Sequence, residues 1–336
     1  MPRRPRARRP ADVLAEAWER RGARAWLLRP LAWLFGLLAA ARRQAYARGW
    51  RTVHRLPVPV VVVGNVVAGG AGKTPVVVSL VRHAQAQGWP VGVISRGHGR
   101  RTREGQVVHA DSDPRDVGDE PLLIHRATGA PVVVDADRVA AGRRLLALHP
   151  DTRLIVADDG LQHLPLARDV EICVFDDRGI GNGWLLPAGP LREPWPRRCD
   201  LVLHTGEQPA FAGFRGHRAL AAHALDRQKQ PVLLTELAGR DDLVAVAGIA
   251  QPQRFFDMLR ARSLRLQRCI ALPDHHDYTD WAPPKGVQLL CTEKDAAKLW
   301  PRAPSALAVP LEFSLEPAFF EALDARLSSL DGSEAA

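Results

Sequence analysis

Residues 61–77, VVVGNVVAGGAGKTPVV, place a glycine-rich run between an apolar stretch and a helix-forming one. In the phosphate-loop pattern GxxxxGK[ST], glycines let backbone N–H groups turn inward around phosphate oxygens, the lysine reaches the terminal phosphates, and the hydroxyl residue holds Mg²⁺. Gly72, Lys73 and Thr74 match the end of this pattern, whereas Val67 takes the place of its first glycine. The loop residues expected to contact nucleotide phosphates are Val67, Ala68, Gly69, Gly70, Ala71, Gly72, Lys73 and Thr74. The alternative is a glycine-rich turn between a strand and a helix in which GKT occurs by chance.

Acidic residues and histidines at three other places could complete such a site. Asp158 and Asp159 directly follow an apolar stretch, where phosphate-loop enzymes carry a Mg²⁺-binding carboxylate, but a helix cap is the alternative. Asp119 and Glu120 precede an expected helix, and on spacing alone they indicate ordinary charge at a helix N-terminus. The stretch 272–280, LPDHHDYTD, permits a metal site, a solvated loop, or a histidine that acts as acid or base.

Strands and helices alternate along the part of the chain that carries the loop and the acidic pair. Strands are expected at 58–65, 90–97, 130–137, 152–160 and 170–176, and helices at 74–87 and 138–148. The apolar, β-branched composition of the strands is typical of a parallel sheet that is buried on both faces. The alternation predicts a phosphate-loop NTPase-like α/β fold with a doubly wound parallel sheet, whose functional residues lie at the carboxyl ends of the strands.

More strand and helix patterns follow a loop rich in Pro and Gly at 181–196; they lie at 199–206, 243–259 and 287–300. They predict a second, smaller α/β domain. The expected organisation is therefore an N-terminal segment at 1–50, a phosphate-loop domain at 51–198, the smaller domain at 199–328, and a tail at 329–336.

The positive charge of the chain is concentrated near its N-terminus. Residues 1–55 hold 14 arginines and 3 acidic residues, a net charge of +11, whereas the rest holds 32 basic and 34 acidic residues, a net charge of −2. A nearly neutral body argues against a nucleic-acid partner. The four cysteines form no CxxC pair, which argues against a zinc site or a disulfide framework and fits a reducing compartment.

The N-terminal segment combines arginines with an apolar run of 12 residues at 30–41, whereas a spanning helix needs about 20. We interpret it as a helix in the membrane interface, with arginines at anionic headgroups and apolar side chains toward the acyl chains. The apolar side chains are Trp26, Trp33, Leu34, Phe35, Leu37 and Leu38. The alternatives are a signal peptide and a helix docked on the protein's own core.

Eight stretches, in order and in approximate spacing, resemble the tetraacyldisaccharide 4′-kinase family, the lipid A kinases of Gram-negative bacteria. They are VGNVVAGGAGKTP (63–75), SRGHGR (95–100), VGDEP (117–121), DDGLQH (158–163), LLPAGPLREP (185–194), GIAQPQRFF (248–256), DHHDY (274–278) and TEKDAAKL (292–299). Loops of this family also lack the first glycine of the phosphate-loop pattern, so Val67 is no departure.

The resemblance implies a monomeric, ATP-dependent lipid kinase at the cytoplasmic face of the bacterial inner membrane. Such enzymes transfer the γ-phosphate of ATP to the 4′-hydroxyl of tetraacyldisaccharide 1-phosphate and form lipid IVA. The resemblance also implies that Lys73 contacts the β and γ phosphates, and that Thr74, Glu120 and Asp158 hold Mg²⁺. The Asp158–Asp159 pair together would contribute to metal binding and to organisation of the transition state, and the resemblance leaves open which of the two carboxylates binds the ion.

Asp119 and His275 resemble the catalytic dyad of the family, in which the pair removes the proton of the sugar hydroxyl. Closure of the second domain would bring His275 to the phosphate loop. Arg96 and Arg100 would meet a substrate phosphate or form surface ion pairs, and His276 is the less favoured of the two adjacent histidines.

Two other functions fit parts of the sequence. A phosphate-loop ATPase of the partitioning or metal-insertion type would use ATP as a conformational switch. Its loop often carries a second lysine, which Val67 and Ala68 do not provide. A non-enzymatic module anchored to a membrane by the basic helix would leave the loop and the acidic pair without a role.

Overall fold

The computed structural model describes residues 18–102 and 104–331 of the 336-residue chain. The polypeptide divides into two compact units, each formed by separate stretches of the chain. Unit 1 takes its residues from Met1–Lys73, Ala157–Gly216 and Glu316–Ala336, and unit 2 consists of Thr74–Val156 and His217–Leu315. The domain limits expected from the sequence stay a prediction.

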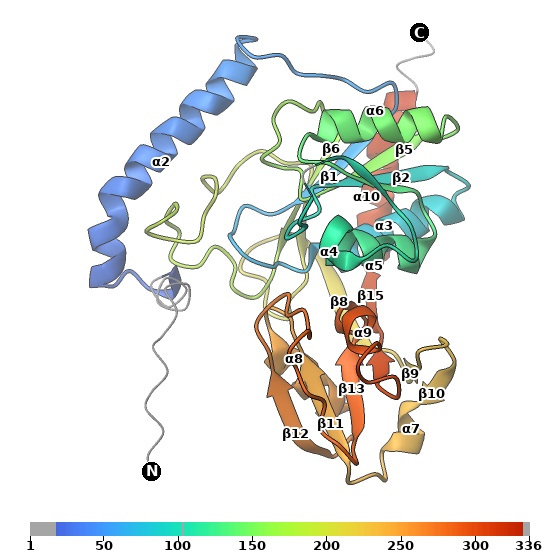
Figure 1. Cartoon of the computed structure of the whole chain (residues 1–336). Helices are drawn as coiled ribbons and strands as arrows, with labels where there is room; N and C mark the ends of the chain where they lie inside the picture. The colour runs from blue at the N-terminus through green and yellow to red at the C-terminus, as the bar shows by residue number, and fades with distance from the viewer. Residues whose placement is uncertain (1–17, 103, 332–336) are drawn as a thin grey trace. The chain divides into compact units, whose positions relative to one another are not determined.

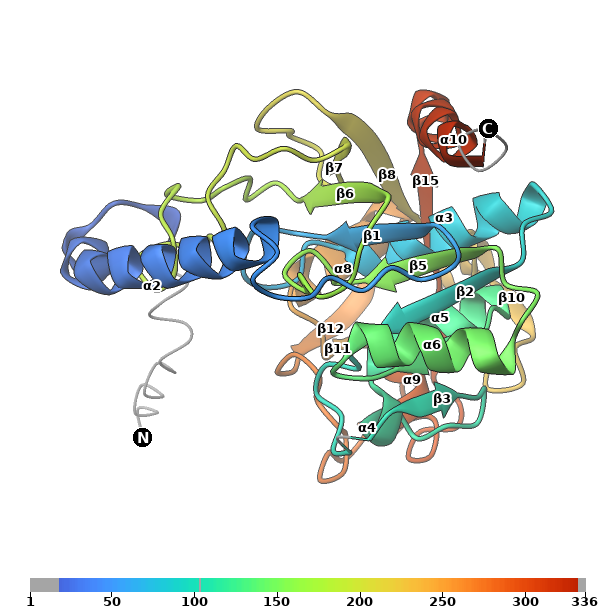
Figure 2. The same ribbon diagram turned by 90° about the horizontal axis from the view of Figure 1, so that it is seen from above.

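The strands of unit 1 run parallel in the order β8-β7-β6-β1 (Figure 2). They are β1 (Val60–Gly64), β6 (Val170–Phe175), β7 (Leu201–His204) and the first residues of β8 (Phe214–Leu220). Val61 pairs with Val170, and Ile172 pairs with Leu201. Every residue of β1 is buried, as the run of valines predicts for a strand covered on both faces.

Two helices flank unit 1 in sequence. The C-terminal helix α10 (Pro317–Asp331) packs on β6 and β7 through the buried side chains of Phe319, Leu323 and Leu327. No helix was predicted there, although these three residues recur at the helical spacing of four. The N-terminal helix α2 (Ala23–Ala47) is the long apolar helix expected there.

One side of α2 packs on the irregular loop that joins β6 to β7, and the other side is exposed (Figure 1). Trp26 meets Trp184 of this loop edge-to-face at 4.9 Å, and a Cβ at Gly36 would lie 2.8 Å from Leu185. The small side chains of Ala25 and Ala32 are buried on the same side. Small residues on this side of α2 thus let the loop approach the helix closely.

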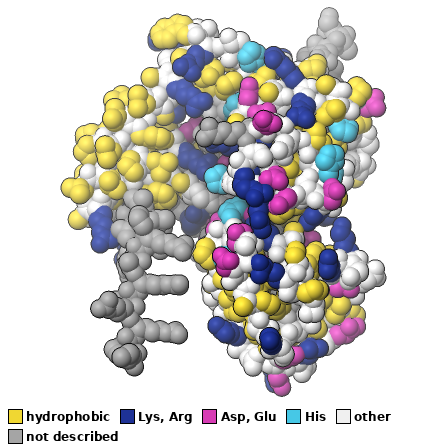
Figure 3. Space-filling model, viewed as in Figure 1, with side chains coloured by type: hydrophobic (Ala, Val, Ile, Leu, Met, Phe, Trp, Pro, Cys, Tyr) yellow, Lys and Arg dark blue, Asp and Glu magenta, His cyan; other side chains and the backbone are white. Residues whose placement is uncertain are grey.

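The opposite side of α2 forms the yellow surface in Figure 3. Its exposed residues are Leu27, Leu31, Trp33, Leu34, Leu37 and Leu38, of which Leu27 is 82% and Leu37 70% exposed; Trp26, at the border with the loop, is also exposed. Phe35, expected on this face, is half-buried. Among the described residues, α2 is the one helix that is long and apolar enough to cross a membrane by length and composition.

Unit 2 contains helices on both faces of the strands β2 and β4. Figure 1 shows α6 on one face, and α3 and α5 on the other. The elements are α3 (Lys73–Ala86), β2 (Val91–Ser95), β3 (Gln106–Val108), α4 (Pro114–Val117), α5 (Asp119–Thr128), β4 (Val132–Val134) and α6 (Arg138–Leu148). β2 and β4 pair in parallel, as predicted, whereas the short β3 pairs antiparallel to β4 and was missed.

Local sequence signals explain where several of these helices begin. The Asp137 carboxylate accepts a hydrogen bond from the Val139 N–H at 2.9 Å and thereby caps α6, which begins at Arg138 as predicted. Asp113 caps α4 in the same way, with Pro114 in the first turn. The strand β5 (Leu154–Asp158) follows α6 and leads along the chain from unit 2 into unit 1.

The remainder of unit 2 is a mixed six-stranded sheet in the order β10-β9-β14-β13-β11-β12. β14, β13, β11 and β12 run parallel to one another, and β9 pairs antiparallel with both β14 and β10. Its elements are β9 (His223–Leu225), β10 (Pro231–Leu233), α7 (Leu234–Leu237), β11 (Leu243–Ala247), α8 (Pro252–Ala261), β12 (Leu266–Ala271), β13 (Gln288–Thr292), α9 (Glu293–Leu299) and β14 (Leu307–Val309). The strand β15 (Leu311–Leu315) ends this unit.

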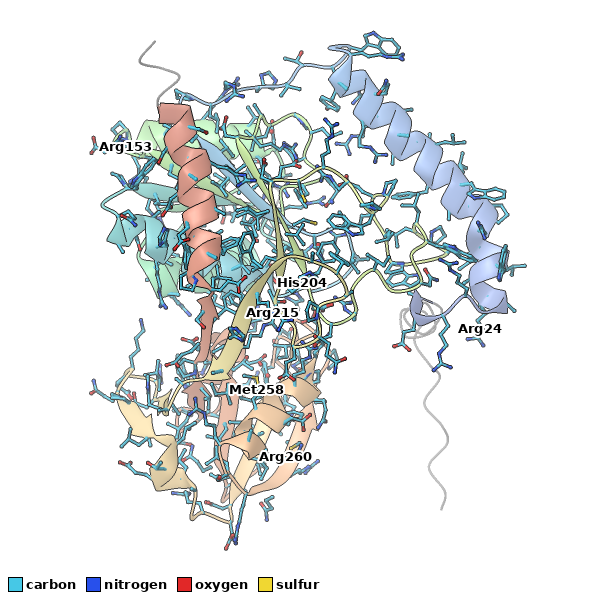
Figure 4. All side chains as sticks on the ribbon, turned by 180° about the vertical axis from the view of Figure 1, so that it is seen from behind. Arg24, Arg153, His204, Arg215, Met258 and Arg260 are labelled. Atoms are coloured by element: carbon cyan, nitrogen blue, oxygen red, sulfur yellow. The ribbon has the colours of Figure 1, made fainter. Side chains whose placement is uncertain are left out.

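Two hydrophobic clusters fill the two faces of this sheet. Leu243, Ala245 and Ala247 of β11 belong to one cluster, while Val244 and Val246 belong to the other. The amphipathic helix α8, on which Figure 4 labels Met258 and Arg260, covers the first cluster with Phe255 and Phe256 among others. The α/β class with largely parallel sheets, predicted from the sequence, is therefore confirmed. The strands β9, β10, β12 and β14 were missed because they are short or carry polar residues.

Candidate active site

The loop after β1 depends on glycines at particular points. A Cβ at Gly64, the last residue of β1, would lie 2.6 Å from Leu161 Cγ, so a larger residue would displace that side chain. Gly69 and Gly72 have φ angles of 95° and 72°, in the left-handed region that glycine adopts without strain. The helix α3 starts at the next residue, Lys73. The strand, glycine loop and helix expected of a phosphate-binding turn are thus all present.

The loop lysine is held by two oxygen atoms within unit 1. Lys73 Nζ lies 3.3 Å from Asn65 Oδ1 and 3.4 Å from Asp159 Oδ1, and the side chain is buried. Asp159 also faces Arg192, whose Nη1 lies 3.5 Å from both carboxylate oxygens. Its neighbour Asp158 is buried at the end of β5. The structure therefore brings the predicted lysine and the second residue of the predicted acidic pair together.

The other two residues predicted to hold Mg²⁺ belong to unit 2. Thr74 is buried in the first turn of α3, and Glu120 is half-buried at the second position of α5. Within residues 18–102 and 104–331, no three His, Cys, Asp or Glu side chains are grouped so that they could hold a metal ion by themselves. The metal-binding roles of Thr74, Glu120 and Asp158 stay predictions.

Asp119 and His275 are in direct contact within unit 2. His275 Nδ1 lies 2.8 Å from Asp119 Oδ2, although 156 positions separate the residues in sequence. Asp119 is the first residue of α5, which follows Gly118 with its φ of 94°. His275 has a φ of 59°, and its N–H donates to Gly248 O at 3.0 Å. Asp119 is therefore more than helix N-terminal charge, because its buried carboxylate holds an imidazole in place.

The contacts of Asp119 decide its charge. Burial raises the pKa of this carboxyl, but hydrogen bonds with His275 and Lys298 outweigh burial and hold the pKa below its usual range. Lys298 Nζ donates to the same Oδ2 atom at 2.7 Å. Since the ionised carboxylate only accepts hydrogen bonds, it directs the Nδ1–H of His275 toward itself, and in the neutral imidazole the lone pair is then on Nε2.

Two lysines of α9 lie beside this pair, one next to each residue, and neither had a role predicted from the sequence. Lys298 contacts Asp119 as described, and Lys294 Nζ lies 3.4 Å from His275 Nε2 and 3.6 Å from Asp274 Oδ1. Their spacing of four residues places them on one face of the helix. The sequence signal that could have identified these lysines is their spacing of four within TEKDAAKL, about 20 residues after the two histidines.

The second histidine has a different environment. His276 Nδ1 accepts a hydrogen bond from the Tyr278 N–H at 2.9 Å, and its ring packs edge-to-face on the Tyr278 ring. It thereby stabilises the turn that carries His275. His98 of the SRGHGR stretch is an aromatic neighbour of His275, with ring centroids 6.1 Å apart. In the same stretch Arg96 is exposed, and Arg100 donates to the backbone oxygen of Glu104.

An α/β fold whose first strand leads into a glycine loop with a buried lysine belongs to the phosphate-loop class of nucleotide-binding proteins. A sequence model of one family, described as tetraacyldisaccharide-1-P 4′-kinase (LpxK), matches residues 24–328. The chain belongs to this family.

Curated relatives and a crystal structure agree with that family. The chain is similar to tetraacyldisaccharide 4′-kinases of Acidovorax sp. (strain JS42), at 57% identity over 96% of both chains, and of Chromobacterium violaceum, at 47% identity over 95% of this chain and 99% of the relative. It is also similar to the crystal structure of LpxK from Aquifex aeolicus in complex with ATP. That match has a TM-score of 0.78 and 28% identity, and covers 90% of this chain and 99% of the other. The fold and family expected from the sequence are confirmed.

Proposed function

We propose that this protein transfers the γ-phosphate of ATP to the 4′-hydroxyl of tetraacyldisaccharide 1-phosphate and forms lipid IVA, a step of lipid A biosynthesis. The family, with relatives at 57% identity over 96% of the chain, supports the reaction and its substrates. The observation within the molecule that carries the proposal is the hydrogen bond between Asp119 and His275. A sugar hydroxyl is a weak nucleophile, and a positioned base is what it needs.

ATP binds at the glycine loop of residues 67–74, with its phosphates toward those backbone N–H groups of the loop that have no backbone acceptor among the described residues. Lys73 is the phosphate ligand of this loop. Its ammonium group is already desolvated and is held by Asn65 and Asp159 at 3.3 and 3.4 Å, so little reorganisation is needed when phosphate oxygens replace these partners.

The residues predicted to hold Mg²⁺ fit the ion by their chemistry. Mg²⁺ prefers oxygen ligands, and Thr74, Glu120 and Asp158 supply a hydroxyl and two carboxylates. When bound, the ion neutralises charge on the transferring phosphate. Lys73 is the side-chain cation that also neutralises charge on the transferring phosphate.

The acceptor hydroxyl loses its proton to His275. With Nδ1–H directed to the Asp119 carboxylate, Nε2 takes up the 4′-OH proton while the sugar oxygen forms its bond to the γ-phosphorus and ADP leaves. About a third of the His275 side chain is exposed, so a substrate can reach it. Asp119 keeps the tautomer and stabilises the imidazolium that results. The reaction requires the loop and the Asp119–His275 pair to meet around the substrates.

The test of this proposal is incubation with labelled ATP, Mg²⁺ and tetraacyldisaccharide 1-phosphate in detergent, with the 4′-phosphorylated lipid as product. Lys73→Ala, Asp119→Ala and His275→Ala should each reduce product strongly. ATP hydrolysis at the same rate without lipid would instead favour a nucleotide switch, and an unchanged rate for His275→Ala would remove the base.

The exposed apolar side of α2 supports attachment to the membrane that holds the lipid substrate. Arg29 lies over the rings of Trp26, Trp184 and Trp33 at 4.6, 4.3 and 5.7 Å, an arrangement suited to a headgroup region. Replacing Leu27, Leu37 and Leu38 by Asp should release the protein from anionic vesicles in flotation assays, while activity on detergent-solubilised substrate persists. Unchanged flotation would exclude this face as the membrane contact.

A further inference from the structure

Side chains of unit 1 donate hydrogen bonds to the backbone oxygens of the glycine loop. Five consecutive carbonyl groups, from Val67 to Ala71, each lie within hydrogen-bond distance of a side-chain donor. Three residues provide all of these donors: Asn65, Arg178 and Thr205. None of them was singled out in the sequence.

Asn65 uses both hydrogens of its amide on the loop. Its Nδ2 donates to Val67 O at 2.6 Å and to Gly69 O at 3.2 Å, while its Oδ1 accepts from Lys73 at 3.3 Å. The residue is completely buried. It therefore couples the path of the loop to the position of the phosphate-binding lysine.

Arg178 contacts the carbonyls of Ala68 and Gly70, which alternate along the loop with those held by Asn65. Nη1 lies 3.4 Å from Ala68 O and Nη2 lies 2.7 Å from Gly70 O. Nε faces both carboxylate oxygens of Asp176 at 3.0 Å, and this carboxylate is buried just after β6. Because the guanidinium group is planar and rigid, its contact with Asp176 after β6 fixes the position of the two loop carbonyls that it also contacts.

Thr205 completes the set. Its Oγ1 lies 2.9 Å from Ala71 O, the nearer acceptor for its single hydrogen, and 3.2 Å from Phe175 O at the end of β6. The residue follows His204, the last residue of β7, which is labelled in Figure 4. The Thr205 N–H is itself fixed by Phe175 O at 2.8 Å.

Outward carbonyls have a consequence for the N–H groups. In a planar trans peptide the C=O of one residue and the N–H of the next point in opposite directions. Holding the carbonyls of residues 67–71 therefore turns the N–H groups of 68–72 the other way. The Ala68 N–H donates to Pro190 O at 2.7 Å, and within the described chain those of 69–72 have no backbone acceptor. Four neighbouring N–H groups without a backbone acceptor are the donors that a phosphate-binding concavity requires.

We propose that Asn65, Arg178 and Thr205 are positioning residues that keep the loop in its phosphate-binding shape before the nucleotide arrives. The proposal rests on the proposed function, since it assumes that ATP phosphates occupy the loop. It assigns to Arg178 a role in the affinity for ATP without contact between Arg178 and the nucleotide. The affinity for the lipid acceptor is independent of these three residues.

The experiment measures ATP binding by titration calorimetry, and the KM for each substrate and kcat by the labelled assay. Arg178→Ala should raise the Kd and the KM for ATP about tenfold or more, since loss of pre-organised donors lets the loop fluctuate. The KM for the lipid should change less than about twofold. Arg178→Lys keeps the charge but not the planar fork, so it should restore only a minor part of the affinity.

Arg55→Ala is the matched control. Arg55 forms an ion pair with Asp169 at 2.6 Å near the start of β1, the end opposite the loop. Its removal should leave the Kd for ATP unchanged. If Arg178→Ala proves too unstable by its melting temperature, Thr205→Val and Thr205→Ser replace it: Val should weaken ATP binding about threefold, and Ser should restore it.

The outcomes separate the inference from the proposed function. Wild-type protein that neither binds ATP nor phosphorylates the lipid contradicts the function. Wild-type activity together with a normal Kd for ATP in folded Arg178→Ala or Thr205→Val overturns the inference alone. Full recovery by Arg178→Lys also overturns it, because the positive charge would then suffice.

Discussion

The glycine loop and the Asp119–His275 pair hold their principal side chains in similar ways but over very different chain distances. Lys73 is held by an amide eight residues earlier, in the same strand-to-helix turn. His275 is held by a carboxylate 156 residues away, and Lys298, which supports that carboxylate, lies a further 23 residues along the chain. In the loop a lysine ammonium group contacts a buried amide oxygen, and in the pair an imidazole contacts a buried carboxylate oxygen.

The difference in chain distance predicts a difference in sensitivity. The strand-to-helix turn and the contacts of Asn65 are local to β1, while Arg178 and Thr205, 108 and 134 positions from the carbonyls of Gly70 and Ala71, add long-range support to the loop. The pair exists only when α5, the turn carrying His275 and α9 are packed together in unit 2. We therefore expect substitutions in the core of unit 2 to affect the pair first, and substitutions beside the loop to affect nucleotide binding first.

The largest effects should separate the two sites. His275→Ala should lower kcat by roughly 10²–10⁴-fold, the usual contribution of a positioned base, and leave the Kd for ATP unchanged. Lys73→Ala should lower kcat and weaken ATP binding together. Single-turnover kinetics and calorimetry on the two variants measure this. If His275→Ala weakened ATP binding as much as Lys73→Ala, the two sites would not be separable.

A smaller loss is expected at Lys298. Lys298→Met removes the ammonium group from Asp119 Oδ2 and leaves the buried carboxylate with His275 alone, which should lower kcat about tenfold, the worth of one charge-assisted hydrogen bond. The control is Lys285→Met, because Lys285 is exposed in the same unit. Equal rates for the two variants would show that the pair does not need Lys298.

The smallest effects should appear in stability, at Asp295. This buried carboxylate accepts from the Gly248 N–H at 3.1 Å and from Thr292 Oγ1 at 2.7 Å, and the carbonyl of Gly248 in turn holds the His275 N–H. Asp295→Ala leaves the buried Gly248 donor without its acceptor and should cost about 1–3 kcal/mol, whereas Asp295→Asn should cost less. Urea unfolding measures both, and equal losses would contradict the stated reason.

The pH dependence at Asp295 has a definite sign. Burial, partly offset by the hydrogen bonds, raises the pKa of this carboxyl above its ordinary value of 3.8. The folded state then keeps its proton to higher pH than the unfolded chain, so this group's contribution to stability falls as pH rises from about 3.8 through the raised value. Asp295→Asn should lack that fall. A variant with the same pH slope as the wild type would show that Asp295 does not titrate there.

Much of the loop region followed from the sequence because its signals are local. The valine run predicted β1, and GKT with the nearby glycines predicted the turn and the start of α3, all of which the structure contains. The helix α6 was predicted at its observed bounds, since Asp137 caps it. By contrast β3 and the strands β9, β10, β12 and β14 were missed, because short or polar strands depend on tertiary packing more than on a sequence period.

The sequence by itself determined the α/β class, the phosphate loop and the family, because glycine placement, strand composition and motif order are properties of neighbouring residues. Only the tertiary structure decided which distant groups meet. Spacing alone indicated only helix charge at Asp119, whose pairing with His275 was expected from the family resemblance, and the two lysines of α9 and Arg178 had no predicted role. Hydrogen bonds between residues far apart in sequence depend on the packing of whole elements, and no local pattern records that packing.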